Sequence, residues 1–183
     1  MSQIKVDSIV PRGGIPSGAE GGGIIQIVSE IHTDTFNTNS TSFTSITGFN
    51  AAITPRSSSS KIYVTVWMGA AGTNASNLDN PPAYIITRNG SACDLRGAAA
   101  GSRNRYAMKG HAWAYNSDHM SGGICIMGID TPASTSTQTY QMTVSCQNSS
   151  MPFYLNRTSN DYDGSQHWRF RSFSSFTLME VSG

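Results

Sequence analysis

Two carboxylates, Asp161 and Asp163, flank a tyrosine in the segment Asp-Tyr-Asp-Gly, residues 161–164. Paired carboxylates can cleave a glycosidic bond, and Asp118 and Asp130 offer further partners. Carboxylate oxygens also suit Ca²⁺, but the other ligands of a known calcium loop are missing from the segment. Asp and Gly stabilise turns through local hydrogen bonds and positive φ. We therefore interpret the segment as a turn and predict neither a catalytic pair nor a calcium site in it.

The other reactive side chains form no catalytic or metal-binding pattern. The histidines lack the HxH or HxxxH spacing of metal ligands, although a threefold axis can build a site from a single histidine: they are His32, His111, His119 and His167. The serines include no GxSxG turn, and the glycines at 21–23 are followed by neither a lysine nor a helical pattern, unlike a phosphate loop. We predict a protein that is not an enzyme, with no catalytic residue, no metal and no cofactor.

Aromatic rings and cations near the Asp-Tyr-Asp-Gly segment point to binding instead. Tyr162 and Trp168 provide planes on which a sugar ring can stack. Arg103, Arg105 and Arg169 provide fork-shaped donors for anionic groups. This chemistry suits a surface glycan or an anionic lipopolysaccharide group; the alternative is a core tryptophan with arginines that are solvated or bridge subunits. The candidate receptor-binding residues are Asn77, Asp79, Arg103, Arg105, Asp161, Tyr162, Asp163 and Trp168.

The charge of the chain indicates no electrostatic partner. Charged residues make up 13% of the 183 residues and the net charge is +1, so solubility must rest on hydroxyl and amide groups. No two Lys or Arg residues are adjacent, which argues against nucleic acid and against an anionic membrane surface as partners.

The cysteines and the apolar segments indicate a cellular context. Cys93, Cys125 and Cys146 have no CxxC spacing, and we interpret them as small hydrophobic residues rather than a disulfide framework. No window approaches the roughly 20 apolar residues of a membrane span, and the first residues include no apolar signal segment. We expect a protein made in the cytoplasm, without membrane insertion.

The chain divides into an arm, a hinge and a head. Residues 4–10, IKVDSIV, form a short apolar arm, and a hinge rich in glycine and proline extends from the arm to residue 23. Such a hinge adds little to a core, so its role is to position the head relative to the arm. We predict an anchoring arm and hinge at residues 1–23 and one head domain at residues 24–183. The arm would attach to a partner surface through Ile4, Val6, Ile9 and Val10.

The head shows β-strand patterns and no helical periodicity. Residues 61–72, KIYVTVWMGAAG, alternate most clearly and are expected to form a central strand. Asn89-Gly90 between β-formers predicts a tight hairpin, and Gly48 within a strand pattern predicts a bulge. About ten short strands separated by turn residues indicate an all-β fold, an antiparallel jelly-roll sandwich.

The number of strands predicts where the loops lie. If about ten strands alternate in direction, the end of the chain returns to the end of the head where the arm enters. The opposite end would then gather the longest polar connections, which suits a binding tip. These connections are residues 37–41, 72–82, 100–105, 131–137 and 158–167.

Several segments together resemble small tail-fibre and virion structural proteins of tailed bacteriophages, particularly those of marine and cyanobacterial hosts. They are MSQIKVDSIVPRGG, GGGIIQIV, TDTF, SITG, ITPRSSSSKIYVTV, the Arg-Asn-Gly turn, TPASTSTQTYQM, Asn156-Arg157 and TLMEVSG. The resemblance implies an arm that attaches to the particle and a C1q/TNF-like jelly-roll head that assembles as a trimer. It also implies a virion location and partners among other virion proteins, either of the tail (adaptor, nozzle or baseplate) or of the capsid.

Three functions fit these expectations. The first is a short trimeric tail fibre or host-contact module, the second a capsid decoration protein, and the third a free carbohydrate-binding module. Apolar residues on both faces of the first and central strands, such as Ile24, Val28, Tyr63 and Trp67, are consistent with a threefold interface. The alternative is an ordinary sandwich with amphipathic outer positions.

Overall fold

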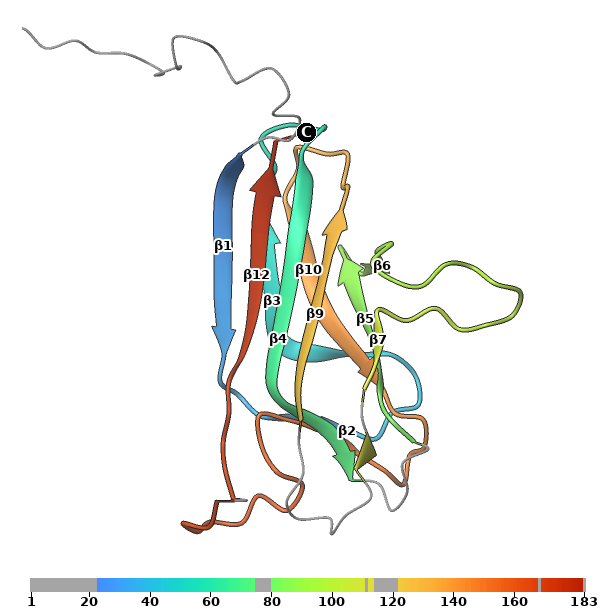
Figure 1. Cartoon of the computed structure of the whole chain (residues 1–183), viewed down its shortest axis with the longest axis vertical. Helices are drawn as coiled ribbons and strands as arrows, with labels where there is room; N and C mark the ends of the chain where they lie inside the picture. Colours follow the sequence, from blue (N-terminus) through green and yellow to red (C-terminus); the bar gives the residue numbers. More distant parts are fainter. Residues whose placement is uncertain (1–22, 75–79, 111, 114–121, 168, 183) are drawn as a thin grey trace, which may run out of the picture.

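The structure is a computed structural model that describes residues 23–74, 80–110, 112–113, 122–167 and 169–182. These residues form strands and connections and contain no helix. The strands make two mainly antiparallel sheets that face each other (Figure 1). The predicted all-β sandwich of the jelly-roll type is therefore confirmed.

The first sheet has β4 at its centre. β12 pairs with one side of β4 and with β1, β9 pairs with the other side, and the far end of β4 pairs with β11 and β8. The central position predicted for this strand is confirmed. The strands of the sheet are β1 (Ile24–His32), β2 (Phe36–Thr38), β4 (Lys61–Asn74), β8 (Ala112–Trp113), β9 (Gly122–Asp130), β11 (Phe153–Leu155) and β12 (Ser174–Val181).

The second sheet has the order β3-β10-β5-β6, with β7 also paired to β5. The β5–β6 turn has φ of 51° at Asn89 and 81° at Gly90, as a type I′ hairpin requires, so the predicted turn is confirmed. The strands are β3 (Thr44–Ile53), β5 (Ala83–Arg88), β6 (Ser91–Ala92), β7 (Met108–Lys109) and β10 (Gln138–Ser145).

The bulge predicted at Gly48 is also present. Gly48 has a φ of 74°, and the register of β3 against β10 shifts between Gln141 and Thr143. Ile46 is buried before the bulge and Phe49 after it, so the irregularity moves the buried positions from even to odd residue numbers. The bulge thereby keeps both halves of β3 facing the core.

The core lies between the two sheets. Large side chains with almost no exposure meet there, and Phe49 of the second sheet packs edge-to-face on Phe176 of the first, with ring centroids 5.7 Å apart. Tyr84 and Phe153 make a second such pair at 5.8 Å. These contacts bury enough apolar surface to hold the sheets together without a disulfide, and all three cysteines are free.

The two ends of the described chain lie at the same end of the head, as predicted. Ile24 is opposite Val181, and the Ser182 N–H donates to the carbonyl of Gly23 at 3.3 Å. Residues 1–22, including the predicted anchoring residues, lie outside the described residues. The end of the head away from Gly23 is called the distal end below.

Two of the five predicted distal loops lie elsewhere. Residues 131–137 follow Asp130, which is opposite Ile62 near the Gly23 end. Residues 100–105 belong to a long loop that leaves the side of the sandwich midway along its height (Figure 1). The strand count failed there because residues 93–107, called the lateral loop below, take the place of a full strand along the edge of β5.

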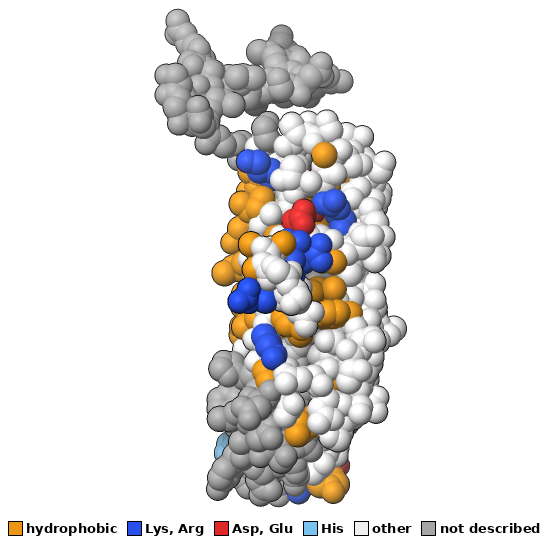
Figure 2. Space-filling model, turned by 90° about the vertical axis from the view of Figure 1, so that its right-hand side faces the viewer, with side chains coloured by type: hydrophobic (Ala, Val, Ile, Leu, Met, Phe, Trp, Pro, Cys, Tyr) orange, Lys and Arg blue, Asp and Glu red, His pale blue; other side chains and the backbone are white. Residues whose placement is uncertain are grey.

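The outer faces of the two sheets differ in chemistry. One flank of the head in Figure 2 is lined with hydrophobic side chains, and the other is largely uncharged and polar. The second sheet turns the partly exposed Asn50 and Gln141 outward in one row, whereas the first sheet turns large apolar side chains outward. The outward residues of the first sheet that define its apolar face are Ile27, Ile31, Tyr63, Trp67, Met127 and Ile129.

Glu180 on β12 is fully buried, and the hydrogen bonds to its carboxylate predict that stability depends on pH. Its carboxylate accepts hydrogen bonds from Gln26 Nε2 at 2.5 Å and from the Arg56 N–H at 2.7 Å. Burial alone would raise the pKa of Glu180, but these hydrogen bonds outweigh it and hold the pKa below the usual 4.5. A depressed pKa contributes stability above the ordinary value and loses it as the pH falls through the folded-state pKa.

We therefore expect Glu180→Gln to lower the free energy of unfolding by about 1 to 3 kcal/mol at pH 7, since hydrogen bonds to a charged group are lost. The difference from the wild type should shrink as the pH falls from roughly 5 to 3. Urea unfolding at several pH values measures it. A deficit that stays constant down to the lowest pH would show that the charge of Glu180 contributes nothing.

Candidate functional site

A pocket of about 310 Å³ lies within the distal loop, residues 157–171. The loop follows β11 and is closed at its base by a β-bridge between Arg157 and Arg171. A closed base lets a polar surface loop keep one shape without a core of its own. The pocket is lined by Thr158, Asp161, Tyr162, Asp163, Gly164, Arg169, Phe170 and Arg171.

Asp161 organises the charges of the pocket. One oxygen, Oδ2, contacts the Arg171 guanidinium at 2.7 Å and the Arg157 guanidinium at 3.5 Å. The residue has a φ of 51°, a left-handed conformation that Asp tolerates. Because two guanidinium groups already neutralise this carboxylate, it is a poor ligand for Ca²⁺.

Tyr162 gives the pocket an exposed aromatic surface. Its side chain is 60% exposed, and the Arg169 guanidinium carbon lies 5.6 Å from the ring centroid. Arg169 also donates to the carbonyl of Asp163 at 2.9 Å. Gly164 leaves room beside it, because a Cβ there would meet the Arg169 guanidinium in its present position. The result is an aromatic plane held beside fork donors.

Asn156 holds the base of the distal loop in place. Its buried side chain donates from Nδ2 to the carbonyls of His32 at 2.9 Å and Asp34 at 3.0 Å, and Oδ1 accepts from Ser174 Oγ at 2.7 Å. Its φ is 58°. One side chain therefore fixes the end of β1, the start of β12 and the entry to the pocket.

Three of the predicted receptor-binding residues come together in this pocket: Asp161, Tyr162 and Asp163. Asn77, Asp79 and Trp168 lie outside the described residues, as do the predicted anchoring residues Ile4, Val6, Ile9 and Val10. Arg103 and Arg105 do not join them in this pocket, because both belong to the lateral loop. Arg105 Nε donates to the Gly97 carbonyl at 2.5 Å and Arg103 Nη1 to the Ala100 carbonyl at 3.3 Å, which keeps both arginines within that loop.

The sequence analysis missed the arginines that frame the pocket. Arg157 and Arg171 stand 4 and 10 residues from Asp161, and only the closed base of the loop brings all three together. Three arginines and two aspartates lie in or beside the pocket, so positive charge is in excess there. The signal in the sequence was the pair of arginines on either side of the Asp-Tyr-Asp-Gly turn.

A second pocket, of about 390 Å³, lies beside the distal ends of β5 and β10. Lys109 donates to Gln147 Oε1 at 2.8 Å, and Tyr106 contacts Phe43 with ring centroids 5.9 Å apart. The amide, hydroxyl and ammonium groups of this pocket could bind polar ligands, but it has no exposed aromatic ring held beside arginines as the first pocket has. It is lined by Thr41, Pro81, Ala83, Asn104, Tyr106, Lys109, Ser145, Cys146 and Gln147.

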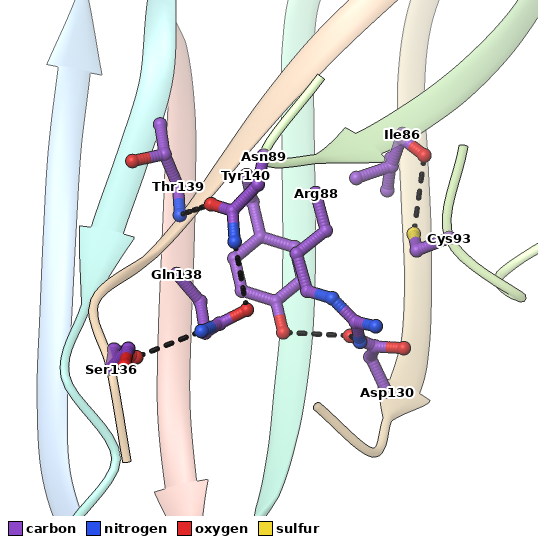
Figure 3. Close-up of polar contacts among 9 residues, drawn as sticks. All are labelled: Ile86, Arg88, Asn89, Cys93, Asp130, Ser136, Gln138, Thr139 and Tyr140. Carbon is purple, nitrogen blue, oxygen red and sulfur yellow. Dashed lines mark hydrogen bonds and ion pairs between the residues drawn. The ribbon is translucent and has the colours of Figure 1, made fainter. Parts of the chain in front are cut away.

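Asp130 lies in a polar network between the sheets, far from Asp161. Arg88 pairs with Asp130, and the Tyr140 hydroxyl donates to the same oxygen at 2.7 Å (Figure 3). Burial, together with the hydrogen bond and charge of Asp130, raises the pKa of Tyr140 well above its usual value. Tyr140 therefore remains a donor, and Asp130 is a structural carboxylate rather than a partner of Asp161 in glycoside cleavage.

A second set of side-chain hydrogen bonds fixes the β5–β6 hairpin next to this network. Asn89 Nδ2 donates to Gln138 Oε1 at 3.0 Å, and its Oδ1 accepts from the Thr139 N–H at 2.9 Å. Beyond the turn, the Cys93 thiol contacts the Ile86 carbonyl at 3.1 Å, and burial raises the pKa of this thiol (Figure 3). A thiol with a raised pKa is a weak nucleophile, which fits a structural role.

The described residues include no group of three His, Cys, Asp or Glu that could hold a metal ion. His32 is buried against Phe49, with ring centroids 5.2 Å apart, and burial lowers its pKa.

In the part of the chain that the structure describes, no helix is long and apolar enough to cross a membrane.

Comparison of the chain with known protein families and with curated proteins finds no match.

Proposed function

We propose that this chain is a non-enzymatic structural protein of a bacteriophage virion, a short tail fibre or host-contact module attached through residues 1–23. The observation that carries the proposal is that the two ends of the head differ. The chain enters and leaves the head at one end, and the distal pocket lies beyond the opposite ends of the strands. A head anchored at one end is suited to present its other end to a surface. The resemblance of the chain to phage tail and virion proteins supports the same function.

The head is further proposed to be a homotrimer. Its apolar face exposes 59% of Ile27, 62% of Met127 and 57% of Ile129, and the side chains in the rows between them are hydroxyl-bearing or apolar. Contiguous apolar surface of this kind usually marks an interaction site. The polar face of the other sheet would remain in water.

The distal pocket is proposed to bind a surface glycan. Tyr162 offers a stacking plane, and Arg169 and Arg171 offer donors to hydroxyl or acidic groups of a sugar. A volume of about 310 Å³ lies at the lower end of the range for small-molecule sites, so the pocket suits a terminal sugar unit rather than a long chain.

Replacement of Tyr162 by alanine tests the glycan site. We expect at least about a tenfold loss of binding to any immobilised bacterial surface polysaccharide that the wild type retains, since the stacking plane is lost. Phe43→Ala is the matched control, because it removes a partly exposed ring outside this pocket. Equal binding by the Tyr162 variant and the wild type would remove the pocket from the proposal.

The virion function is tested by labelling the N-terminus in intact particles and imaging them by electron microscopy without imposed symmetry. Label at the tail is the expected result. Label over the shell would instead indicate a capsid decoration protein, and particles without label would overturn the virion function. A free carbohydrate-binding module would keep its glycan binding in the last case.

A further inference from the structure

Cations of the head gather on one lateral border. The lateral loop carries Arg96, Arg103 and Arg105 against a single acid, Asp94, and the closest pair among these, Arg105 and Asp94, is 4.0 Å apart. Figure 2, which views this border, shows the group of Lys and Arg side chains between the two flanks. Arg103 is exposed and pairs with no carboxylate of the described residues.

The opposite border carries acids. Glu30 lies on β1, which is the outermost strand of the first sheet, and Asp34 follows it; both are exposed. Neither forms an ion pair with a Lys or Arg among the residues that the structure describes. Figure 1 shows β1 and the lateral loop on opposite sides of the head.

The lateral loop contacts the first sheet close to the level of Glu30. Glu30 is opposite Phe176, Phe176 is opposite Val66, and Val66 is opposite Ile126 across the sheet. The lateral loop reaches the sheet two residues further along β9, at Gly128. Leu95 packs so closely there that a Cβ on Gly128 would lie only 2.6 Å from its side chain. Two residues of strand span about 7 Å, so a rotation about an axis parallel to the strands can bring the two borders of neighbouring copies together.

We propose that copies of this chain join side by side, with the lateral loop of one copy docked on the Glu30 and Asp34 border of the next. The apolar face of each copy then turns toward the common axis. Opposite charge on the two borders makes a second copy of the chain the fitting partner, because one molecule carries both halves of the contact. A contact between two different surfaces closes into a ring when the rotation allows it, and this arrangement rests on the proposed homotrimer.

The unpaired edges of the first sheet also support side-by-side packing. β1 pairs only with β12, and β9 pairs only with β4, in the part of the chain that is described. Exposed apolar edge strands invite association, and soluble proteins usually protect them with charges or cover them. Side-by-side packing would cover both edges, since β1 lies at one border and β9 near the other.

Charge reversal tests the contact. The full chain is compared by sedimentation with the variants Glu30→Lys, Arg103→Glu and the combination of both. Each single variant should dissociate at least tenfold more readily, since like charges then face each other, and the double variant should recover most of the loss. Arg56→Glu is the matched control, because this exposed cation lies in the connection between β3 and β4 at the Gly23 end of the head, outside both borders and the apolar face.

Cys125 provides a second readout of the same assembly. It is exposed on the first sheet opposite Trp67, whereas Cys93 and Cys146 are buried. Maleimide should label Cys125 slowly in the wild-type oligomer and faster in the single variants. Unchanged dissociation in both single variants, or a double variant weaker than either, would overturn the docking while leaving the trimer intact. A wild type that sediments as a monomer with rapidly labelled Cys125 would overturn both.

Discussion

Replacing Asn156 with alanine is expected to lower the free energy of unfolding by about 3 to 5 kcal/mol and to abolish glycan binding. The variant leaves the carbonyls of His32 and Asp34 and the hydroxyl of Ser174 without their partner in a buried place. Alanine must also adopt a φ near 58°, which adds about 1 to 2 kcal/mol for a residue with a Cβ that lacks the local hydrogen bonds of Asn. Chemical unfolding measures the loss of stability.

Asn156→Gly separates the two causes. Glycine accepts the left-handed conformation without strain, so this variant should lose the hydrogen bonds alone and remain more stable than the alanine variant by about 1 kcal/mol. If both variants unfold with nearly wild-type stability, water replaces the side chain and Asn156 does not hold the loop. Retained glycan binding in the alanine variant would show that the pocket forms without it.

Much of the sandwich was predictable from local patterns. The alternation of residues 61–72 predicted the centre of the first sheet because it is the clearest strand pattern in the chain, and a long regular strand offers pairing along both of its edges. The turn at Asn89-Gly90 and the bulge at Gly48 were predictable because only a few residue types tolerate positive φ. These features depend on a residue and its immediate neighbours.

Features that depend on distant pairing were not predictable. β6, β7 and β8 have two residues each, too few to show a period, so the lateral loop was placed at the distal end with Arg103 and Arg105. Within the distal site, the Asp-Tyr-Asp-Gly segment was identified from its residue types. The frame of Arg157 and Arg171 around it depends on the bridge that closes the loop, which no local pattern records.

Arg88→Ala is expected to lower the free energy of unfolding by about 3 kcal/mol, the second largest effect expected for this protein. Removal of one partner from a buried ion pair leaves the other charge buried without compensation, and Asp130 is only 5% exposed. The Arg88 side chain is 27% exposed, which places the expected loss at the lower end of the range for buried pairs. Thermal and urea unfolding at pH 7 measure it.

Tyr140→Phe is the companion variant. It removes one hydrogen bond to Asp130 and leaves the ion pair, so the expected loss is about 1 to 2 kcal/mol. A combined change of Arg88→Met, Asp130→Leu and Tyr140→Phe should recover most of the stability, because it removes the buried charge together with its partners. Recovery would mean that the network selects the hairpin geometry rather than supplying net stability. A triple variant that is less stable than Arg88→Ala would instead show that the polar network itself holds β5, β9 and β10 together.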